Sequence, residues 1–171
     1  PIEIPDREAL GMATHLDAAK GAYIIKEYDM NRPKEGLVIV RGTSSTNSLV
    51  EILPKLKLKG PNVKVVAAIS WELFQQQTEG YRQSTISNQE WMDAMVITNG
   101  AKRLMHKWIA NRVVEEYSMS PDFDNRWRSG GSLDEIIAES KLDSESVWEG
   151  INQFARSRKQ RLASIQESIP E

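Results

Sequence analysis

The 171-residue sequence contains no cysteine. This absence excludes disulfide bonds, thiolate metal sites and cysteine nucleophiles, and it is compatible with a cytoplasmic setting. Histidine is scarce as well, because only His15 and His106 occur. One lies in a linker-like segment and the other between basic residues, so neither has the carboxylate neighbours of a metal site. We expect both histidines to lie on the surface.

The sequence also lacks a large charge excess and a long apolar run. Its formal net charge is −2, which is too small to attract a polyanion and argues against a nucleic-acid partner. No apolar stretch approaches the roughly 18 residues that a membrane-spanning helix needs. We therefore expect neither a nucleic acid nor a membrane as a partner.

The overall composition is that of an ordinary globular domain. Hydrophobic residues make up 40% of the chain and charged residues 27%, which argues against wholesale disorder. Pro1 and Pro5, together with the absence of an initial methionine, are typical of an inter-domain linker. We therefore expect a linker in residues 1–21 and one domain in residues 22–171, both belonging to a larger protein.

Apolar runs predict five strands, at residues 22–28, 37–41, 63–69, 94–98 and 112–117. The middle runs are too uniformly apolar to have a solvated face, so they fit inner strands with helices on both sides. Helical spacing of apolar residues follows the strands, and one long helix is expected from Ser144 to Ile169. These elements predict an α/β fold: a three-layer α/β/α sandwich on a mostly parallel five-stranded sheet with one antiparallel edge strand.

Capping residues and a proline suggest where some helices begin and end. Ser70 stands where the N-cap of the helix after the third strand belongs. Pro54 should kink or end the helix that follows the second strand, because proline lacks the N–H donor. Residues 101–110 place Leu104 and Trp108 on one face, which predicts a short amphipathic helix.

The best candidate for a binding site is the loop that follows the second strand. A strand, a Gly/Ser/Thr loop and a helix start would together point N–H donors at one spot, where an anion could bind through Thr43, Ser44, Ser45 and Thr46. The loop has neither the glycine spacing of a dinucleotide site nor the glycine-lysine pair of a Walker loop. Serine and threonine are also ordinary helix caps, so the anion site and the capping role both remain open.

Two charged clusters and the tryptophans fit structural roles better than functional ones. The acidic residues near Gly130 lack the alternating ligand register of a calcium loop and predict a solvated loop; they are Asp122, Asp124, Asp134 and Glu135. The basic run of the closing helix predicts a solvated helix face, with docking to phosphate or another subunit as the alternative; it comprises Arg156, Arg158, Lys159 and Arg161. The five tryptophans are expected to anchor the core or an interface.

Several motifs in this order resemble the C-terminal domain of the transketolase family. The most specific is Ile69–Phe74 (ISWELF), which is followed by Gln77 and by Tyr81. Lys20–Tyr23 (KGAY) resembles the start of the first strand in that domain. The resemblance extends from about Lys20 to Ile165. It implies the same fold, although Thr43 and Ser45 stand where the family usually has glycine and glutamate.

The resemblance also implies a role. Transketolases bind thiamine diphosphate and a divalent cation (Mg or Ca) between two preceding domains, and they transfer two-carbon ketol units between sugar phosphates in the pentose phosphate pathway. The third domain would support the fold and the homodimer, its partners being the cofactor-binding domains and the second subunit. The resemblance therefore implies no catalytic, cofactor-binding or metal-binding residue here, and a fragment that is inactive on its own in a cytoplasmic enzyme of carbohydrate metabolism.

Two alternatives remain open at this point. The chain could be the C-terminal domain of a related thiamine enzyme, the first component of a 2-oxoacid dehydrogenase. It could instead be a regulatory module that binds an anionic ligand at the helix start Ser44–Asn47.

Overall fold

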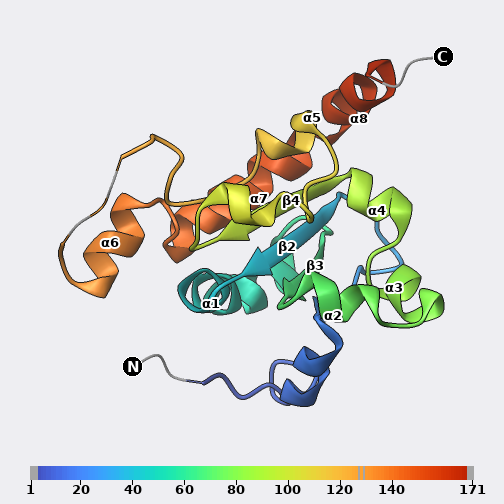
Figure 1. Cartoon of the computed structure of the whole chain (residues 1–171), viewed down its shortest axis with the longest axis horizontal. Coiled ribbons are helices and arrows are strands. Elements are labelled where there is room, and N and C mark those ends of the chain that lie inside the picture. The colour runs from blue at the N-terminus through green and yellow to red at the C-terminus, as the bar shows by residue number, and fades with distance from the viewer. Residues whose placement is uncertain (1–3, 127, 129, 169–171) are drawn as a thin grey trace.

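A four-stranded sheet lies at the centre of the computed structural model, which describes residues 4–126, 128 and 130–168 (Figure 1). Its strands are β1 (Ala22–Lys26), β2 (Leu37–Arg41), β3 (Lys64–Ala68) and β4 (Ala94–Thr98), in the order β1-β3-β2-β4. Strand β2 pairs in parallel with both β3 and β4, whereas β1 pairs antiparallel with β3 at the edge. The mostly parallel sheet with one antiparallel edge strand is therefore confirmed.

Helices cover both faces of the sheet. They are η1 (His15–Lys20), α1 (Thr43–Lys59), α2 (Trp71–Gln75), α3 (Glu79–Thr85), α4 (Asn88–Met92), η2 (Lys102–Met105), α5 (Arg112–Glu115), α6 (Leu133–Glu139), α7 (Ser144–Arg156) and α8 (Arg158–Glu167). Helices α1 and α7 pack on one face, and α2 to α4 with η2 lie against the other. This arrangement is the predicted three-layer sandwich.

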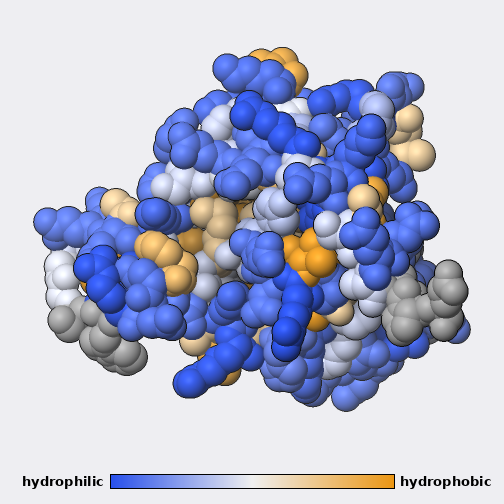
Figure 2. All heavy atoms as spheres, turned by 90° about the horizontal axis from the view of Figure 1, so that it is seen from above, coloured by the Kyte–Doolittle hydropathy of each residue, from blue (hydrophilic) through white to orange (hydrophobic). Residues whose placement is uncertain are grey.

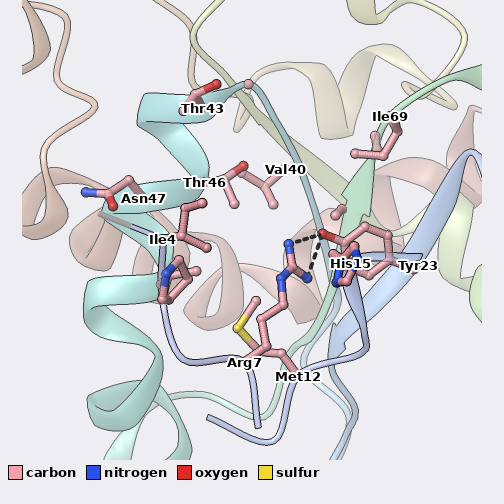
Figure 3. Close-up of a pocket in the computed structure, with 15 residues that line it drawn as sticks. Ile4, Arg7, Met12, His15, Tyr23, Val40, Thr43, Thr46, Asn47 and Ile69 are labelled. Carbon is pink, nitrogen blue, oxygen red and sulfur yellow. Dashed lines mark hydrogen bonds between the residues drawn. The ribbon is translucent and has the colours of Figure 1, made fainter. Parts of the chain in front are cut away.

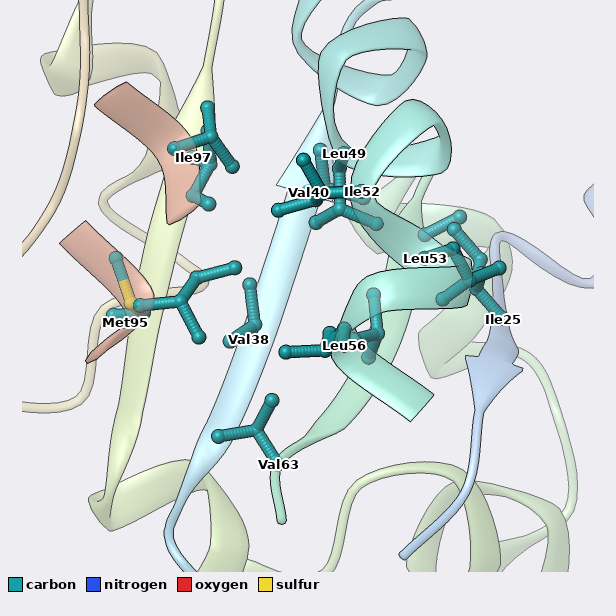
Figure 4. Packing of buried hydrophobic residues seen from close by; sticks show 14 of the residues in the cluster. Ile25, Val38, Val40, Leu49, Ile52, Leu53, Leu56, Val63, Met95 and Ile97 are labelled. Atoms are coloured by element: carbon teal, nitrogen blue, oxygen red, sulfur yellow. The ribbon is translucent and has the colours of Figure 1, made fainter. Parts of the chain in front are cut away.

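The two-residue repeat of the strands divides the core into two clusters, one on each face of the sheet. Val38 and Val40 of β2 face α1 and α7, whereas Leu37 and Ile39 face the opposite layer. Figure 4 shows the first cluster, in which the strand side chains pack against leucines of α1. Because both faces of each inner strand are buried, the strands read as continuous apolar runs in the sequence.

The predicted fifth strand is wrong. Residues 112–117 instead begin with helix α5, whose first turn is capped by the Asn111 side chain accepting from the Val114 N–H at 3.0 Å. After α5, Met119 forms an isolated parallel bridge to Ile97 of β4. The sheet has four strands among the described residues because the chain turns through a helix before it reaches the edge of β4.

The prediction of one long closing helix is also wrong in one respect, because the helix divides at Ser157 into α7 and α8. The Ser157 hydroxyl donates to the Phe154 carbonyl at 3.0 Å, and the Arg161 guanidinium donates to the same carbonyl. A side chain that bonds back to the helix carbonyls bends a helix. Ile169, the predicted end of the helix, lies outside the described residues.

Two smaller expectations also differ from the structure. Residues 101–110 form the short 3-10 helix η2 and turns, so Met105 and Trp108 are buried while Leu104 is 60% exposed. Pro54 does not end α1, which continues to Lys59. Pro54 is exposed on the helix surface, where its ring and its missing N–H disturb the packing least.

Candidate functional site

The candidate site lies at the carboxyl ends of the two central strands. After β2 the chain enters α1 on one face of the sheet, and after β3 it enters α2 on the other. Ligands of open α/β sheets bind where neighbouring strands send their connections to opposite faces. A cavity of about 710 Å³ occupies this position.

The cavity has mostly apolar walls and a few polar groups. The apolar lining residues are Ile4, Pro5, Met12, Val40, Val50, Ala67, Ala68 and Ile69. The polar ones are Arg7, His15, Tyr23, Thr43, Thr46 and Asn47, with Gly42 completing the wall. None of the described lining residues is acidic, and Arg7 brings a guanidinium to the wall.

The N-terminal segment closes one side of the cavity, and Arg7 holds it in place. The Arg7 guanidinium donates from both terminal nitrogens to the Tyr23 hydroxyl at 3.3 Å (Figure 3). One of these nitrogens also donates to the Ala13 carbonyl at 3.2 Å. Tyr23 is only 5% exposed. A charged group from the segment before the sheet therefore meets a buried hydroxyl at the wall of the cavity.

The structure separates the four residues of the predicted anion loop into two pairs. Thr43 and Thr46 line the cavity. Ser45 instead donates to the Arg41 carbonyl at 2.6 Å, and the Ser44 hydroxyl accepts from Asn99 at 3.1 Å. The predicted loop thus contributes two of its four hydroxyls to the cavity.

Gly42 explains why α1 begins without a side-chain cap. Its φ is +99°, and a Cβ at this position would fall on the Asn99 side-chain oxygen. A residue with a side chain would be strained here, and the glycine N-cap of α1 has no side chain to bond the first-turn N–H groups. The first turn of α1 also contains no acidic residue.

The two motifs that carry the family resemblance touch each other in the structure. The Gly21 carbonyl accepts from the backbone N–H groups of Ile69 and Ser70, both at 2.9 Å. The Tyr81 hydroxyl donates to the Ala22 carbonyl at 2.9 Å. Ser70 is the N-cap of α2, as predicted, and its hydroxyl accepts from the Leu73 N–H at 3.3 Å.

The tryptophans of this region form a compact aromatic cluster. The rings of Trp71 and Trp108 meet edge to face with 5.0 Å between centroids, and Phe74 stacks on Trp108 at 5.8 Å. The Trp91 indole donates to the Trp108 carbonyl at 3.1 Å. The predicted anchoring role is confirmed for Trp108, which is 2% exposed; Trp127 lies outside the described residues.

The acidic loop is held by ion pairs. Asp124 accepts from Arg126 at 2.8 Å and from Arg128 at 3.0 Å. The hydrogen bond from Arg126 is the main cause that holds the pKa of Asp124 well below its usual range. Among the described residues, no group of three or more His, Asp or Glu is placed to hold a metal ion. Both histidines are exposed, as predicted.

The basic run of the closing helix contains a residue whose role the sequence did not reveal. Arg161 is 1% exposed and pairs with Asp93, which also pairs with Arg158 at 2.7 Å. The Arg161 guanidinium lies 3.6 Å above the Phe154 ring. The prediction of a solvated face is therefore wrong for Arg161, although Arg156 and Lys159 are exposed.

The outer surface that Figure 2 displays is mostly hydrophilic, with hydrophobic side chains in small separate groups. Within the described part of the chain, no helix combines the length and the apolar character that crossing a membrane requires.

Comparisons with known proteins agree on one family. Residues 21–120 match the model of the transketolase-like C-terminal domain. The transketolase of Nostoc sp. is 29% identical over 131 residues, covering 73% of this chain and 19% of that protein. The chloroplastic transketolase of Solanum tuberosum is 37% identical over 71 residues, covering 40% of this chain and 9% of that protein.

Solved structures share the fold. The transketolase of Leishmania mexicana superposes with a TM-score of 0.62 at 18% identity, over 85% of this chain and 19% of that chain. The transketolase of Campylobacter jejuni gives a TM-score of 0.57 at 14% identity, over 78% of this chain and 18% of that one. The chain thus spans about a fifth of the length of the Nostoc relative and of these two structures.

Proposed function

Because the chain belongs to the transketolase-like C-terminal domain family, we propose that it is the non-catalytic third domain of a transketolase. The enzyme would transfer two-carbon ketol units between sugar phosphates. The observation that carries the proposal is the family match over residues 21–120, which contain the whole sheet, the Ile69–Phe74 motif and all but the first residue of Lys20–Tyr23. In this role the domain supports the fold and the assembly of a homodimer.

The residues that line the cavity do not suit the thiamine cofactor. A diphosphate held through Mg or Ca needs oxygen ligands such as carboxylates, and no described residue that lines the cavity is acidic. We therefore derive no catalytic step through the cofactor here. Thiamine diphosphate and the cation would bind in the two preceding domains, which are the partners of this one within the same polypeptide.

The first experiment asks whether the chain is active alone. We expect the purified 171-residue chain to convert no ketose phosphate with an aldose phosphate acceptor, even with thiamine diphosphate and magnesium. The intact polypeptide, assayed beside it, should be active. Turnover by the 171-residue chain would contradict the non-catalytic role.

The second experiment tests the supporting role. In the intact polypeptide, removing residues 22–171 should lower the thermal stability and shift the dimer toward monomer in sedimentation. An unchanged dimer with unchanged stability would contradict the proposal. Assaying the same polypeptide with a 2-oxoacid in place of the sugar phosphates separates a transketolase from the 2-oxoacid dehydrogenase alternative.

The cellular setting belongs to the proposal as well. A transketolase of the pentose phosphate pathway in the cytoplasm fits a chain that lacks cysteine. The potato relative carries the name chloroplastic, so the compartment needs its own test. Cell fractionation with an antibody against the domain provides it, and enrichment in an organelle would contradict the cytoplasmic assignment.

A further inference from the structure

We propose that the cavity between the N-terminal segment and the carboxyl ends of β2 and β3 binds a small amphipathic carboxylate. The ligand would have an apolar body and one carboxylate group. This binding would be separate from the supporting role of the domain.

The size and the walls of the cavity determine the body of the ligand. A volume of about 710 Å³ falls within the range of roughly 300–1,000 Å³ that is typical of sites for small organic molecules. Val40, Ala67 and Ala68 form the wall on the side of the sheet, and Met12 with Ile4 lies on the side of the N-terminal segment. An apolar ligand body removes this surface from water.

Two donors beside these walls determine the head group. The Tyr23 hydroxyl is buried and accepts from Arg7 twice, so its own proton is directed to a different acceptor. The hydrogen bonds to Tyr23 and Ala13 engage both terminal nitrogens of Arg7, and no residue in the described part of the chain accepts from its Nε–H. Figure 3 shows these two groups meeting among the labelled lining residues.

The surrounding charges favour an anion. None of the described lining residues is acidic, and Arg7 brings a guanidinium to the cavity. The uncapped start of α1, where Thr43 and Thr46 line the wall, adds the positive end of a helix dipole. A carboxylate accepts from a guanidinium and a phenol in charge-assisted hydrogen bonds, which are the strong ones.

The same walls disfavour a sugar phosphate, which is one kind of the anionic ligand that the sequence left open. The hydroxyls of a sugar would lie against Val40, Ala67 and Ala68, which provide no side-chain partners. A buried hydroxyl without a partner loses its hydrogen bonds to water and gains none in return. An aliphatic or aromatic carboxylic acid avoids this loss.

Isothermal titration of the full 171-residue chain with octanoate tests the proposal. Two matched probes accompany it: 1-octanol has the same apolar body without the charge, and acetate has the charge without the body. We expect saturable octanoate binding, weaker by at least about tenfold for octanol and by at least about a hundredfold for acetate.

Two variants assign the binding to the cavity. Arg7→Met and Tyr23→Phe should each weaken octanoate binding by about 10- to 100-fold, because each removes a hydrogen bond to a charged group, and should leave octanol binding nearly unchanged. Arg112→Met, at an exposed position on α5, is the control and should bind octanoate as the native chain does. Thermal unfolding of each variant shows that it is folded.

Three results would overturn the proposal: no octanoate binding at millimolar concentration, equal affinity for octanoate and octanol, or octanoate binding that neither folded variant changes. None of these measurements involves turnover. A negative result would therefore contradict the carboxylate site and leave the transketolase assignment unaffected. Conversely, an inactive intact polypeptide would contradict the transketolase assignment and leave the carboxylate site unaffected.

Discussion

At the scale of single residues, Gly21 connects the two motifs that carry the family resemblance. Its φ is +85°, and a Cβ there would overlap the backbone of both Ser70 and Phe74 at the start of α2. Gly21→Ala should lower the free energy of unfolding by roughly 3–5 kcal/mol, because it combines a left-handed backbone with overpacking. Urea unfolding followed by circular dichroism measures the change.

Gly80 provides the matched control for Gly21. It lies within α3, and nothing lies within 4 Å of the position that its Cβ would take. Gly80→Ala should stabilise the chain by about 0.5–1 kcal/mol, because alanine loses less backbone entropy in a helix. Equal effects of the two substitutions would contradict the close approach at Gly21.

Arg161 provides the second prediction at this scale. Arg161→Met leaves the buried Asp93 carboxylate with Arg158 as its remaining cation, and removing one partner of a buried ion pair typically costs about 3–5 kcal/mol. Arg156 is exposed, so the free energy of unfolding of Arg156→Met should stay within about 0.5 kcal/mol of that of the native chain. Restoration of part of the loss by adding Asp93→Asn would identify the unpaired charge as the cause, and no restoration would contradict it.

The sequence does not distinguish Arg161 from its basic neighbours. All four basic residues of the run lie within six positions, and which of them turns inward depends on Asp93, 68 residues earlier in the chain. The Gly21 carbonyl likewise meets Ser70 only through the fold. Side-chain burial and pairing of this kind depend on tertiary contacts, which local spacing does not contain.

At the scale of elements, burial on both faces made the three parallel strands predictable, whereas a helix cap made α5 unpredictable. The runs of β2, β3 and β4 are apolar throughout, which leaves little choice but a buried strand. Residues 112–117 have a short apolar run that suits either a strand or a helix. Asn111 stabilises the helix: its side-chain oxygen caps α5, and its side-chain nitrogen donates to the distant Met92 carbonyl.

Asp143, the N-cap of α7, gives a prediction of pH dependence. Burial raises its pKa, but hydrogen bonds from Ser146 and from the backbone N–H of Glu145 outweigh burial, so the pKa is lowered overall. A lowered pKa means that the folded state binds fewer protons than the unfolded state. The stability from this cap is therefore present above the unfolded value of about 3.9 and is lost as the pH falls through the lower folded value.

Two substitutions at Asp143 separate the charge from the cap. Asp143→Asn keeps a capping oxygen without titrating, so its unfolding free energy should fall less steeply than that of the native chain below about pH 4. Asp143→Ala should lose about 1 kcal/mol at neutral pH. Urea unfolding at a series of pH values provides the measurement, and identical slopes for the native chain and Asp143→Asn would contradict the titration of this cap.

At the scale of the whole molecule, the architecture could be predicted and the cavity could not. Strands alternating with helices are sufficient for a three-layer sandwich. The cavity, however, joins Arg7 before the sheet, Tyr23 on its edge strand, Thr46 on α1 and Ile69 after β3. The predicted loop contained Thr43 and Thr46, but no local pattern in the sequence shows that the N-terminal segment folds back over them.

The boundary between linker and domain remains a prediction, and the packing of the N-terminal segment suggests how to test it. Leu10, Met12 and Ala13 pack against the core cluster on the α1 face, and Arg7 is bonded to Tyr23. Removing residues 1–13 should lower the free energy of unfolding by roughly 1–3 kcal/mol, as expected for partial loss of two large apolar side chains and their neighbours. The sheet should remain folded, because its strands begin at Ala22.

Urea unfolding compares the shortened chain with the full one, and far-ultraviolet circular dichroism verifies that the sheet persists. Arg7→Met in the full chain is the control, because it removes the hydrogen bonds to Tyr23 and keeps Leu10 and Met12. Its free energy of unfolding should fall by less than that of the shortened chain. If the shortened chain were as stable as the full one, residues 1–13 would act as a linker alone. A measurable loss would move the start of the domain into the segment that now counts as linker, and would make the cover of the cavity part of the folded unit.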